Sequence, residues 1–197
     1  MDEPMARPRS FDTSAVLSAA MHCFRRQGYE RVSIKDLEQA TGLTSGSLYN
    51  TYGSKDGLFR SALGHYVETV VRGRIGAFAG PAASLDDLEQ LFLSIWEMPQ
   101  ADGFGCLVTN SAVEFGPGVP SFAADKVAEG LAVAADGIRA VLVRTLGSER
   151  GEQEAAHLAL VYHGVLVLSR SGTLSDAHRQ SINATFDRLR RLAAENS

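Results

Sequence analysis

The sequence predicts an all-α fold of about nine helices, divided between an N-terminal helix-turn-helix domain and a larger C-terminal helical domain. Three observations favour this fold class. Apolar residues recur every three or four positions in one segment after another. Breaks that contain glycine or proline separate these segments, and residues suited to helix capping stand near their ends. No stretch alternates between polar and apolar residues with flanking turn signals, as a β-sheet would require.

The N-terminal part is predicted to hold a flexible arm over residues 1–10 and a helix-turn-helix domain over residues 11–57. Three short helices are expected in this domain, over 13–27, 33–40 and 45–52. Their caps and stops are, in chain order, Asp12 or Thr13, Gly28, Ser33 with Asp36 as a capping box, Gly42, Thr44 and Gly53.

Residues 58–197 are predicted to form a second, larger helical domain. Ser54 caps a long helix that leads into this domain and runs to about residue 78, before a break at 80–83. A proline and two glycines make residues 98–105 a loop. The remaining helices are expected over 84–96, 106–115, 120–146, 151–172 and 176–195.

The formal net charge of −4 excludes a protein whose whole surface coats nucleic acid or a membrane. The charge is unevenly distributed, however. Residues 1–60 hold eight basic and seven acidic side chains, whereas residues 61–197 hold eleven and sixteen. This polarity favours contact of the N-terminal part alone with phosphates.

Two isolated cysteines, Cys23 and Cys106, fit a reducing cytosol better than a disulfide framework. The N-terminus has no apolar run typical of a secretory signal, and no run is long enough to span a bilayer. We therefore expect a cytoplasmic protein without a membrane partner.

A short helix that follows another across a glycine-containing turn is the helix-turn-helix plan. The helix over 45–52 is short enough for its N-terminal half to enter a major groove about 12 Å wide. Small residues at 44–47 permit close approach to base edges, while Tyr49, Asn50 and Tyr52 offer hydroxyl and amide groups. Lys55 adds a cation at the start of the next helix. The alternative is a plain helical hairpin inside a bundle.

Residues 24–59 closely resemble the DNA-binding domain of TetR-family regulators, and the resemblance extends over about residues 11–60. The shared pattern comprises an aromatic residue and a glycine that end the first helix, a serine that opens the second, a glycine turn and the motif Leu48-Tyr49-x-x-Tyr52-x-x-Lys55-x-x-Leu58. The resemblance implies nine or ten helices, a homodimer formed mainly by the helices over 152–172 and 176–195, and a small-molecule pocket that controls DNA affinity. It also implies repression at a palindromic operator.

Carried over by position, the resemblance places Thr44, Ser45 and Ser47 at base edges and leaves Gly46 as a contact position without a side chain. The full set expected to contact double-stranded DNA is Ser33, Thr44, Ser45, Gly46, Ser47, Tyr49, Asn50, Tyr52 and Lys55. Because the leading edge of this helix is small, we expect hydroxyl, backbone and shape readout to outweigh bidentate base contacts.

Aromatic residues mixed with sparse polar groups predict a small-molecule site in the C-terminal domain. The candidates are Trp96, Met98, Phe104, Cys106, Asn110, Phe122, Tyr162 and His163. For each of them the alternative is an ordinary place in the core.

Cys106 begins a helix, and a helix N-terminus favours the thiolate form of a cysteine. The Gly105-Cys106-Leu107 start resembles a branch of TetR-like regulators in which a cysteine at this place senses electrophiles or oxidants. The alternative is an inert residue at a helix start.

The last two predicted helices carry apolar faces that could bury against a second copy in a four-helix arrangement. The residues expected at this dimer interface are Val161, Val165, Leu168, Ile182, Phe186 and Leu189. The alternative is that these faces fill the core of the monomer.

The motifs of common enzymes are missing from the sequence. Ser45 stands fourth in Gly42-x-x-Ser45-Gly46, so this is not the Gly-x-Ser-x-Gly elbow of a hydrolase. His157 and His163 are six residues apart and do not share the helix face that a metal ion would need. We therefore expect no catalytic residues, metal or cofactor. The favoured function is a repressor released from DNA by a small-molecule or electrophile inducer. The main alternative is a helical small-molecule-binding protein that does not bind DNA.

Overall fold

The computed structural model describes residues 11–97 and 104–195. Within these ranges the chain forms helices and no strands. Because α4, η1 and α5 run on as one rod, the described residues hold nine helices, as the sequence predicts, and in addition one 3₁₀ turn. The predicted arm over residues 1–10 and the candidate Met98 lie outside the described residues.

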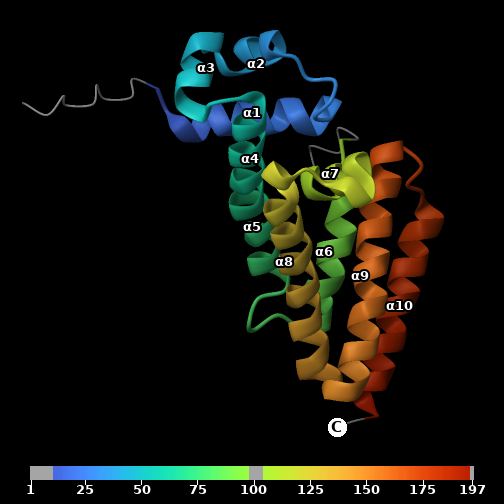
Figure 1. The fold of residues 1–197 in the computed structure, drawn as a ribbon. Coiled ribbons are helices and arrows are strands. Elements are labelled where there is room, and N and C mark those ends of the chain that lie inside the picture. The colour runs from blue at the N-terminus through green and yellow to red at the C-terminus, as the bar shows by residue number, and fades with distance from the viewer. Residues whose placement is uncertain (1–10, 98–103, 196–197) are drawn as a thin grey trace, which may run out of the picture.

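The helices α1, α2 and α3 form one end of the molecule, across the top of an upright bundle (Figure 1). They span Thr13–Gln27, Ile34–Thr41 and Ser45–Tyr52. The predicted caps form at both ends of α1: the Asp12 carboxylate accepts the Ser14 N–H at 2.9 Å, and Gly28 ends the helix with a positive φ of 86°.

A continuous rod leads from the helix-turn-helix into the bundle. It consists of α4 (Lys55–Tyr66), the π-helical segment η1 (Val67–Val71) and α5 (Arg72–Phe78). The sequence predicts one regular helix here, and the π-helical segment is the difference. A π-helix widens one turn and is often found at functional sites.

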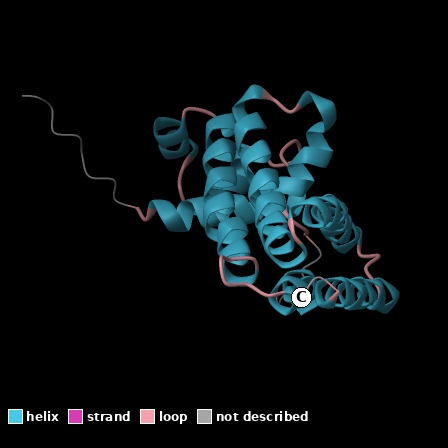
Figure 2. Cartoon of the chain, turned by 90° about the horizontal axis from the view of Figure 1, so that it is seen from below, coloured by secondary structure: helices cyan, strands magenta, loops and turns pink. Residues whose placement is uncertain are grey.

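The bundle is completed by α6 (Leu85–Glu97), α7 (Leu107–Phe115), the 3₁₀ turn η2 (Gly116–Gly118), α8 (Ser121–Leu146), α9 (Ser148–Ser171) and α10 (Asp176–Ala194). Seen from below, the described chain consists of packed helices joined by short loops (Figure 2). None of the described helices has the length and apolar character needed to cross a membrane.

The start of α9 is three residues earlier than the sequence predicts. The expected start is Gly151, but the chain turns at Gly147, which has a positive φ of 81°. Gly151 instead lies within the first turns of α9, where a Cβ atom would stand 2.5 Å from the Val143 Cα. Glycine is required there because α8 and α9 approach each other closely, and not because the helix begins.

Two apolar clusters fill the molecule. The N-terminal cluster joins α1–α4 to the first turns of α7 and α8, with Phe24, Leu37, Leu48 and Phe59 all nearly or fully buried. The C-terminal cluster lies between α6, α8, α9 and α10. Side chains of α4 belong to the first cluster, so this helix packs on both sides of the boundary predicted at residues 57 and 58.

Candidate nucleic-acid interface and ligand cavity

The turn between α2 and α3 is fixed by hydrogen bonds at both helix ends. Gly42 is left-handed, with a φ of 71°, and its N–H donates to the Glu38 carbonyl at 2.9 Å. The Thr44 hydroxyl accepts the Ser47 N–H at 3.3 Å, and the Glu38 carboxylate accepts the Ser45 N–H. The first N–H groups of α3 are thereby paired, and the helix begins at a defined place.

One face of α3 is buried and the opposite face is open. Leu48 is 3% exposed in the N-terminal cluster, whereas Tyr49 is 44% exposed. Thr44, Gly46 and Asn50 are also exposed. The open face therefore runs from the helix N-terminus along the outer end of the molecule, which is the placement that a groove-reading helix requires.

The remaining predicted DNA contacts are less accessible. Ser45 and Ser47 are half-buried, and Tyr52 packs against the N-terminal cluster. Ser33 is exposed, but its hydroxyl donates to the Asp36 carboxylate at 2.6 Å in the predicted capping box. Hydrogen bonds from the Ser33 hydroxyl and from its backbone N–H hold the pKa of Asp36 below its usual range.

Lys55 is held against an aromatic ring at the start of α4. Its Nζ lies 4.4 Å from the centroid of the Tyr29 ring, a cation–π contact. The Tyr29 hydroxyl donates to the Asp56 carboxylate at 2.5 Å, and burial followed by this carboxylate raises the pKa of the phenol. Lys55 is half-exposed, three residues beyond the end of α3.

An aromatic cluster joins the helix-turn-helix to the bundle. The Tyr29 ring lies 5.0 Å from Phe59, 5.5 Å from Phe115 and 5.2 Å from Phe122, measured between centroids. The sequence predicts that Phe122 contacts a ligand. The structure places it in this cluster, outside the cavity described next, because the first turn of α8 packs on α4.

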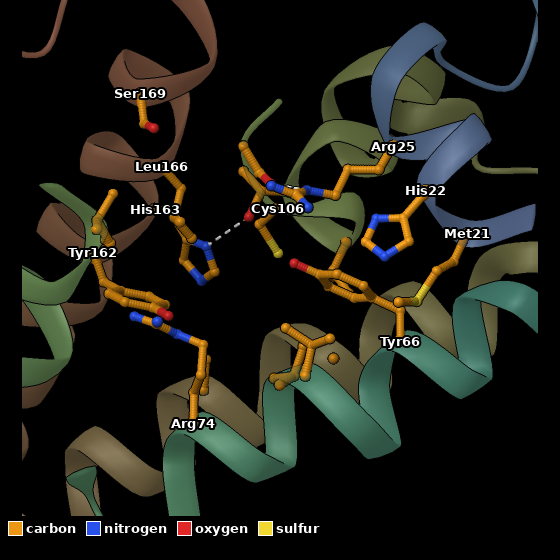
Figure 3. A pocket seen from close by; sticks show the side chains of 18 residues that line it. Met21, His22, Arg25, Tyr66, Arg74, Cys106, Tyr162, His163, Leu166 and Ser169 are labelled. Atoms are coloured by element: carbon orange, nitrogen blue, oxygen red, sulfur yellow. Dashed lines mark hydrogen bonds between the residues drawn. The ribbon is translucent and has the colours of Figure 1, made fainter. Parts of the chain in front are cut away.

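A cavity of about 160 Å³ lies where α1, the α4–α5 rod, α8 and α9 meet the segment 105–109. In Figure 3, Arg74 and Tyr162 stand on one side of it and Tyr66, Met21 and His22 on the other. Three of the predicted ligand residues line this cavity: Cys106, Tyr162 and His163.

Hydrogen bonds order the polar groups in the cavity wall. His163 Nδ1 and the Thr109 hydroxyl lie 3.2 Å apart, as the dashed line in Figure 3 shows. The Tyr66 side chain faces Cys106 across the cavity, and the Tyr162 hydroxyl lies beside the Arg74 guanidinium (Figure 3).

Burial sets the protonation of three of these groups. It raises the pKa of the Tyr66 and Tyr162 phenols and lowers the pKa of the His163 imidazole. All three side chains are therefore neutral near pH 7.

Three other predicted ligand residues lie elsewhere. Trp96 is half-buried against the C-terminal cluster. Phe104 lies next to two guanidinium groups, with the Arg26 Cζ 4.8 Å and the Arg170 Cζ 5.9 Å from its ring centroid. The Asn110 amide is occupied because it donates to the Phe104 carbonyl at 2.6 Å.

Sequence reasoning missed several cavity residues, among them Met21, Tyr66, Arg74 and Thr109. Tyr66 continues the apolar face of α4 and therefore reads as core. Arg74 follows it by eight residues, and the π-helical segment η1 lies between them, so regular helical spacing does not connect the two side chains. Met21 comes from α1, and no local pattern could connect that helix to the cavity.

The cavity is tied directly to α1. Arg25 on α1 is 7% exposed and lines the cavity, and its Nε donates to the Gly105 carbonyl at 2.7 Å. Arg170 on α9 donates to the Arg25 carbonyl at 3.0 Å. The Glu114 carboxylate on α7 accepts the Tyr29 N–H at 3.0 Å, beyond the end of α1. Hydrogen bonds thus link the segment around Gly105 to the helix that supports α2 and α3.

The predicted dimer residues are mostly enclosed by the chain's own helices. Val165, Ile182, Phe186 and Leu189 are between 0% and 4% exposed in the C-terminal cluster, and Val161 packs against it. Of the six predicted dimer residues, only Val161 and Leu168 are partly exposed to solvent. The open face of α9 carries other residues, with Leu160 76% and Val167 43% exposed.

Among the described residues, no group of three or more His, Cys, Asp or Glu side chains is arranged to hold a metal ion.

Comparison with known proteins finds similarity that is strongest in the N-terminal part. The family described as "Bacterial regulatory proteins, tetR family" matches residues 16–62. The uncharacterized HTH-type transcriptional regulator YezE of Bacillus subtilis is 35% identical over 122 residues, 60% of this chain and 62% of YezE. The HTH-type transcriptional repressor ComR of Escherichia coli is 44% identical over 62 residues, 32% of this chain and 30% of ComR. The chain thus matches less than two thirds of the length of these curated relatives.

Solved structures extend the similarity to the bundle. A cysteine mutant of the TetR family transcriptional regulator CifR, complexed with 26-bp double-strand operator DNA, superposes with a TM-score of 0.72. The two are 26% identical, over 92% of this chain and 98% of CifR. The reduced form of Escherichia coli NemR has a TM-score of 0.69 at 15% identity, over 92% of this chain and 97% of NemR, which is a similarity of fold.

Proposed function

Because this chain belongs to the TetR family of bacterial regulatory proteins, we propose that it is a dimeric transcriptional repressor that binds an operator and dissociates from it when a small molecule binds. The observation that carries this proposal is the open face of α3. A short helix with a fixed N-terminus presents Thr44, Gly46, Tyr49 and Asn50 to solvent at one end of the molecule. The solved CifR complex contains operator DNA.

The exposed residues suit a shallow approach to DNA. Thr44 and Gly46 would come close to base edges, while Tyr49 and Asn50 would donate to phosphates. Lys55 would add a charge that is already oriented by Tyr29. Ser33, Ser45, Ser47 and Tyr52 would contribute less because their polar groups are bonded or partly covered.

Release would follow from the connection between the cavity and α1. An inducer that displaces the Gly105 segment would move Arg25 through their hydrogen bond. Because α1 also packs with α2 and α3 in the N-terminal cluster, this movement would shift the helix-turn-helix. An electrophilic inducer would react at the Cys106 thiol in the cavity wall. The protein would act by binding rather than by catalysis, in the cytoplasm where the chromosome lies.

A dimer would let two modules read one palindrome. Half-sites in successive major grooves are about 34–36 Å apart. The outer face of α9, with Leu160, Gly164 and Val167, is apolar and open, and α10 lies beside it at the same edge of the bundle. We place the interface on this face.

The proposal is tested by DNA binding of two α3 variants. We expect the wild-type protein to bind duplex DNA from upstream of its own gene, with an affinity that falls steeply with salt as counterions are released. Tyr49→Ala and Asn50→Ala should each weaken DNA binding about tenfold in fluorescence anisotropy. Each variant loses a contact to the DNA phosphates that contributes roughly 1–2 kcal/mol of binding free energy. Gln90→Ala, an exposed amide on α6, is the matched control.

The same experiment separates the alternative. A helical small-molecule-binding protein would show no salt-dependent duplex binding. Binding that is equally strong in both α3 variants would reject α3 as the docking face.

A further inference from the structure

The cavity contains a cation that no described carboxylate neutralises. Arg74 Nη2 donates to the Leu91 carbonyl and to the Ser94 hydroxyl, both at 2.9 Å. Both partners are neutral. Within residues 11–97 and 104–195, no Asp or Glu lies within ion-pair distance of Arg74 or lines the cavity.

Most arginines of the α4–α5 rod and of α10 are different. Arg60, Arg72, Arg179, Arg188 and Arg190 each contact at least one carboxylate, and all of them stand at the surface of the bundle. A guanidinium that is withdrawn from water without a counter-charge is costly, and an anion that enters the site offsets that cost. The position of Arg74 thus favours an anionic occupant.

The neighbouring polar groups are suited to the same occupant. The Tyr162 hydroxyl lies beside the Arg74 guanidinium in Figure 3, and because the phenol is neutral it can donate a hydrogen bond. The His163 imidazole is uncharged in this surrounding and is bonded to Thr109. No described Asp or Glu stands in the wall to repel an anion.

The rest of the wall limits the size and polarity of the occupant. Val70, Val71, Ile95, Ala134 and Leu166 line the space with aliphatic groups. An apolar cavity of about 150 Å³ holds one benzene molecule, and this cavity measures about 160 Å³. It therefore fits a single substituted ring rather than a fused or extended ligand.

We propose that the cavity binds a small aromatic monocarboxylate, with its carboxylate on Arg74 and Tyr162 and its ring among the aliphatic side chains of Val70, Ile95 and Leu166. The planar guanidinium matches a carboxylate in charge and geometry. Binding of the carboxylate does not depend on the proposed function. Only its role as the inducer rests on the proposed repressor function.

Calorimetric titration of the DNA-free protein tests the ligand class with benzoate, with benzamide and benzylammonium as probes of similar size and different charge, and with salicylate as a second carboxylate. We expect benzoate to bind at least tenfold more tightly than neutral benzamide, and benzylammonium not to bind. Equal affinity for benzoate and benzamide would overturn the proposal. So would failure of both benzoate and salicylate to bind at concentrations of about 5 mM, which is weaker than a useful inducer site.

Three variants assign the preference to one residue. Arg74→Gln keeps a donor for Leu91 but removes the charge, so the tenfold preference for benzoate should disappear while benzamide affinity stays the same. Arg74→Lys should retain most of the preference. Arg139→Gln, at an exposed arginine paired with Glu152, should behave as wild type. A preference that persists in Arg74→Gln would refute the assignment.

The two proposals can fail separately. Carboxylate binding without any duplex binding would remove the repressor function and leave the ligand class. Duplex binding without carboxylate binding would remove the ligand class and leave the repressor function. Benzoate that binds the protein but does not release DNA would leave the ligand class and remove its role as the inducer.

Discussion

A single buried histidine makes the stability of this protein depend on pH. His163 lies in the cavity wall, bonded to Thr109, and its burial holds the pKa of the imidazole below the usual value of 6.5. Near pH 6.5 this histidine binds a proton in the unfolded chain but stays neutral in the folded chain. The free energy of unfolding should therefore fall as the pH drops below about 6.5.

The size of this effect can be measured by urea denaturation between about pH 7 and pH 5. One proton bound only by the unfolded state gives a slope of up to about 1.4 kcal/mol per pH unit. His163→Gln should flatten this part of the slope because glutamine does not titrate. A slope that is the same in wild type and His163→Gln would show that other groups cause it.

Single residues differ in how far the sequence reveals their role. Ser33, Thr44 and Gly28 are recognisable as caps because each acts on N–H or C=O groups within three or four residues. Arg74 and Met21 are not recognisable as cavity residues because their neighbours come from helices far away in the chain. The candidate DNA face was therefore readable from the sequence, and most of the cavity was not.

At the scale of elements, the unpredicted π-helical segment changes what α4 and α5 present to the cavity. Tyr66, Val70, Val71 and Arg74 all line it, and η1 lies between the first and the last of them. The widened turn alters the angular spacing that a regular helix would give. Neither proline nor glycine marks residues 67–71, so the sequence carries no sign of this irregularity.

The packing of α8 against α7 and η1 depends on one glycine. A Cβ atom at Gly130 would lie 2.6 Å from Val108 Cγ2 and 3.1 Å from Val67 Cγ2. Gly130→Ala should lower the free energy of unfolding by about 1–3 kcal/mol, because the crowded valines must move. Calorimetry should show a lower melting temperature.

Gly76→Ala is the matched control for this prediction. Gly76 also lies in a helix, but a Cβ atom added there would meet no atom from another part of the chain within 4 Å. Alanine there should raise the free energy of unfolding by about 0.5–1 kcal/mol through its helix propensity. Stabilisation by Gly130→Ala as well would mean that the helices separate easily at that point.

At the scale of the whole molecule, the helix number and order follow from the sequence, whereas the use of each helix face does not. The same apolar spacing on α9 and α10 is compatible with an internal core and with an interface. The structure uses Ile182, Phe186 and Leu189 internally, since α6 and α8 cover that face. The two interpretations could be separated only once these helices were placed together.

The proposed dimer gives different expectations for the inner and outer faces of α9 and α10. Leu160 is 76% exposed, so Leu160→Glu should leave the fold intact and shift the protein to monomers in sedimentation, because a charge would be buried at the interface. Phe186 is fully buried, so Phe186→Asp should cost about 5 kcal/mol and reduce the helical circular dichroism signal. Ala132→Glu, at an exposed site on α8, should remain dimeric. A Leu160→Glu protein that stays dimeric would place the interface on another face.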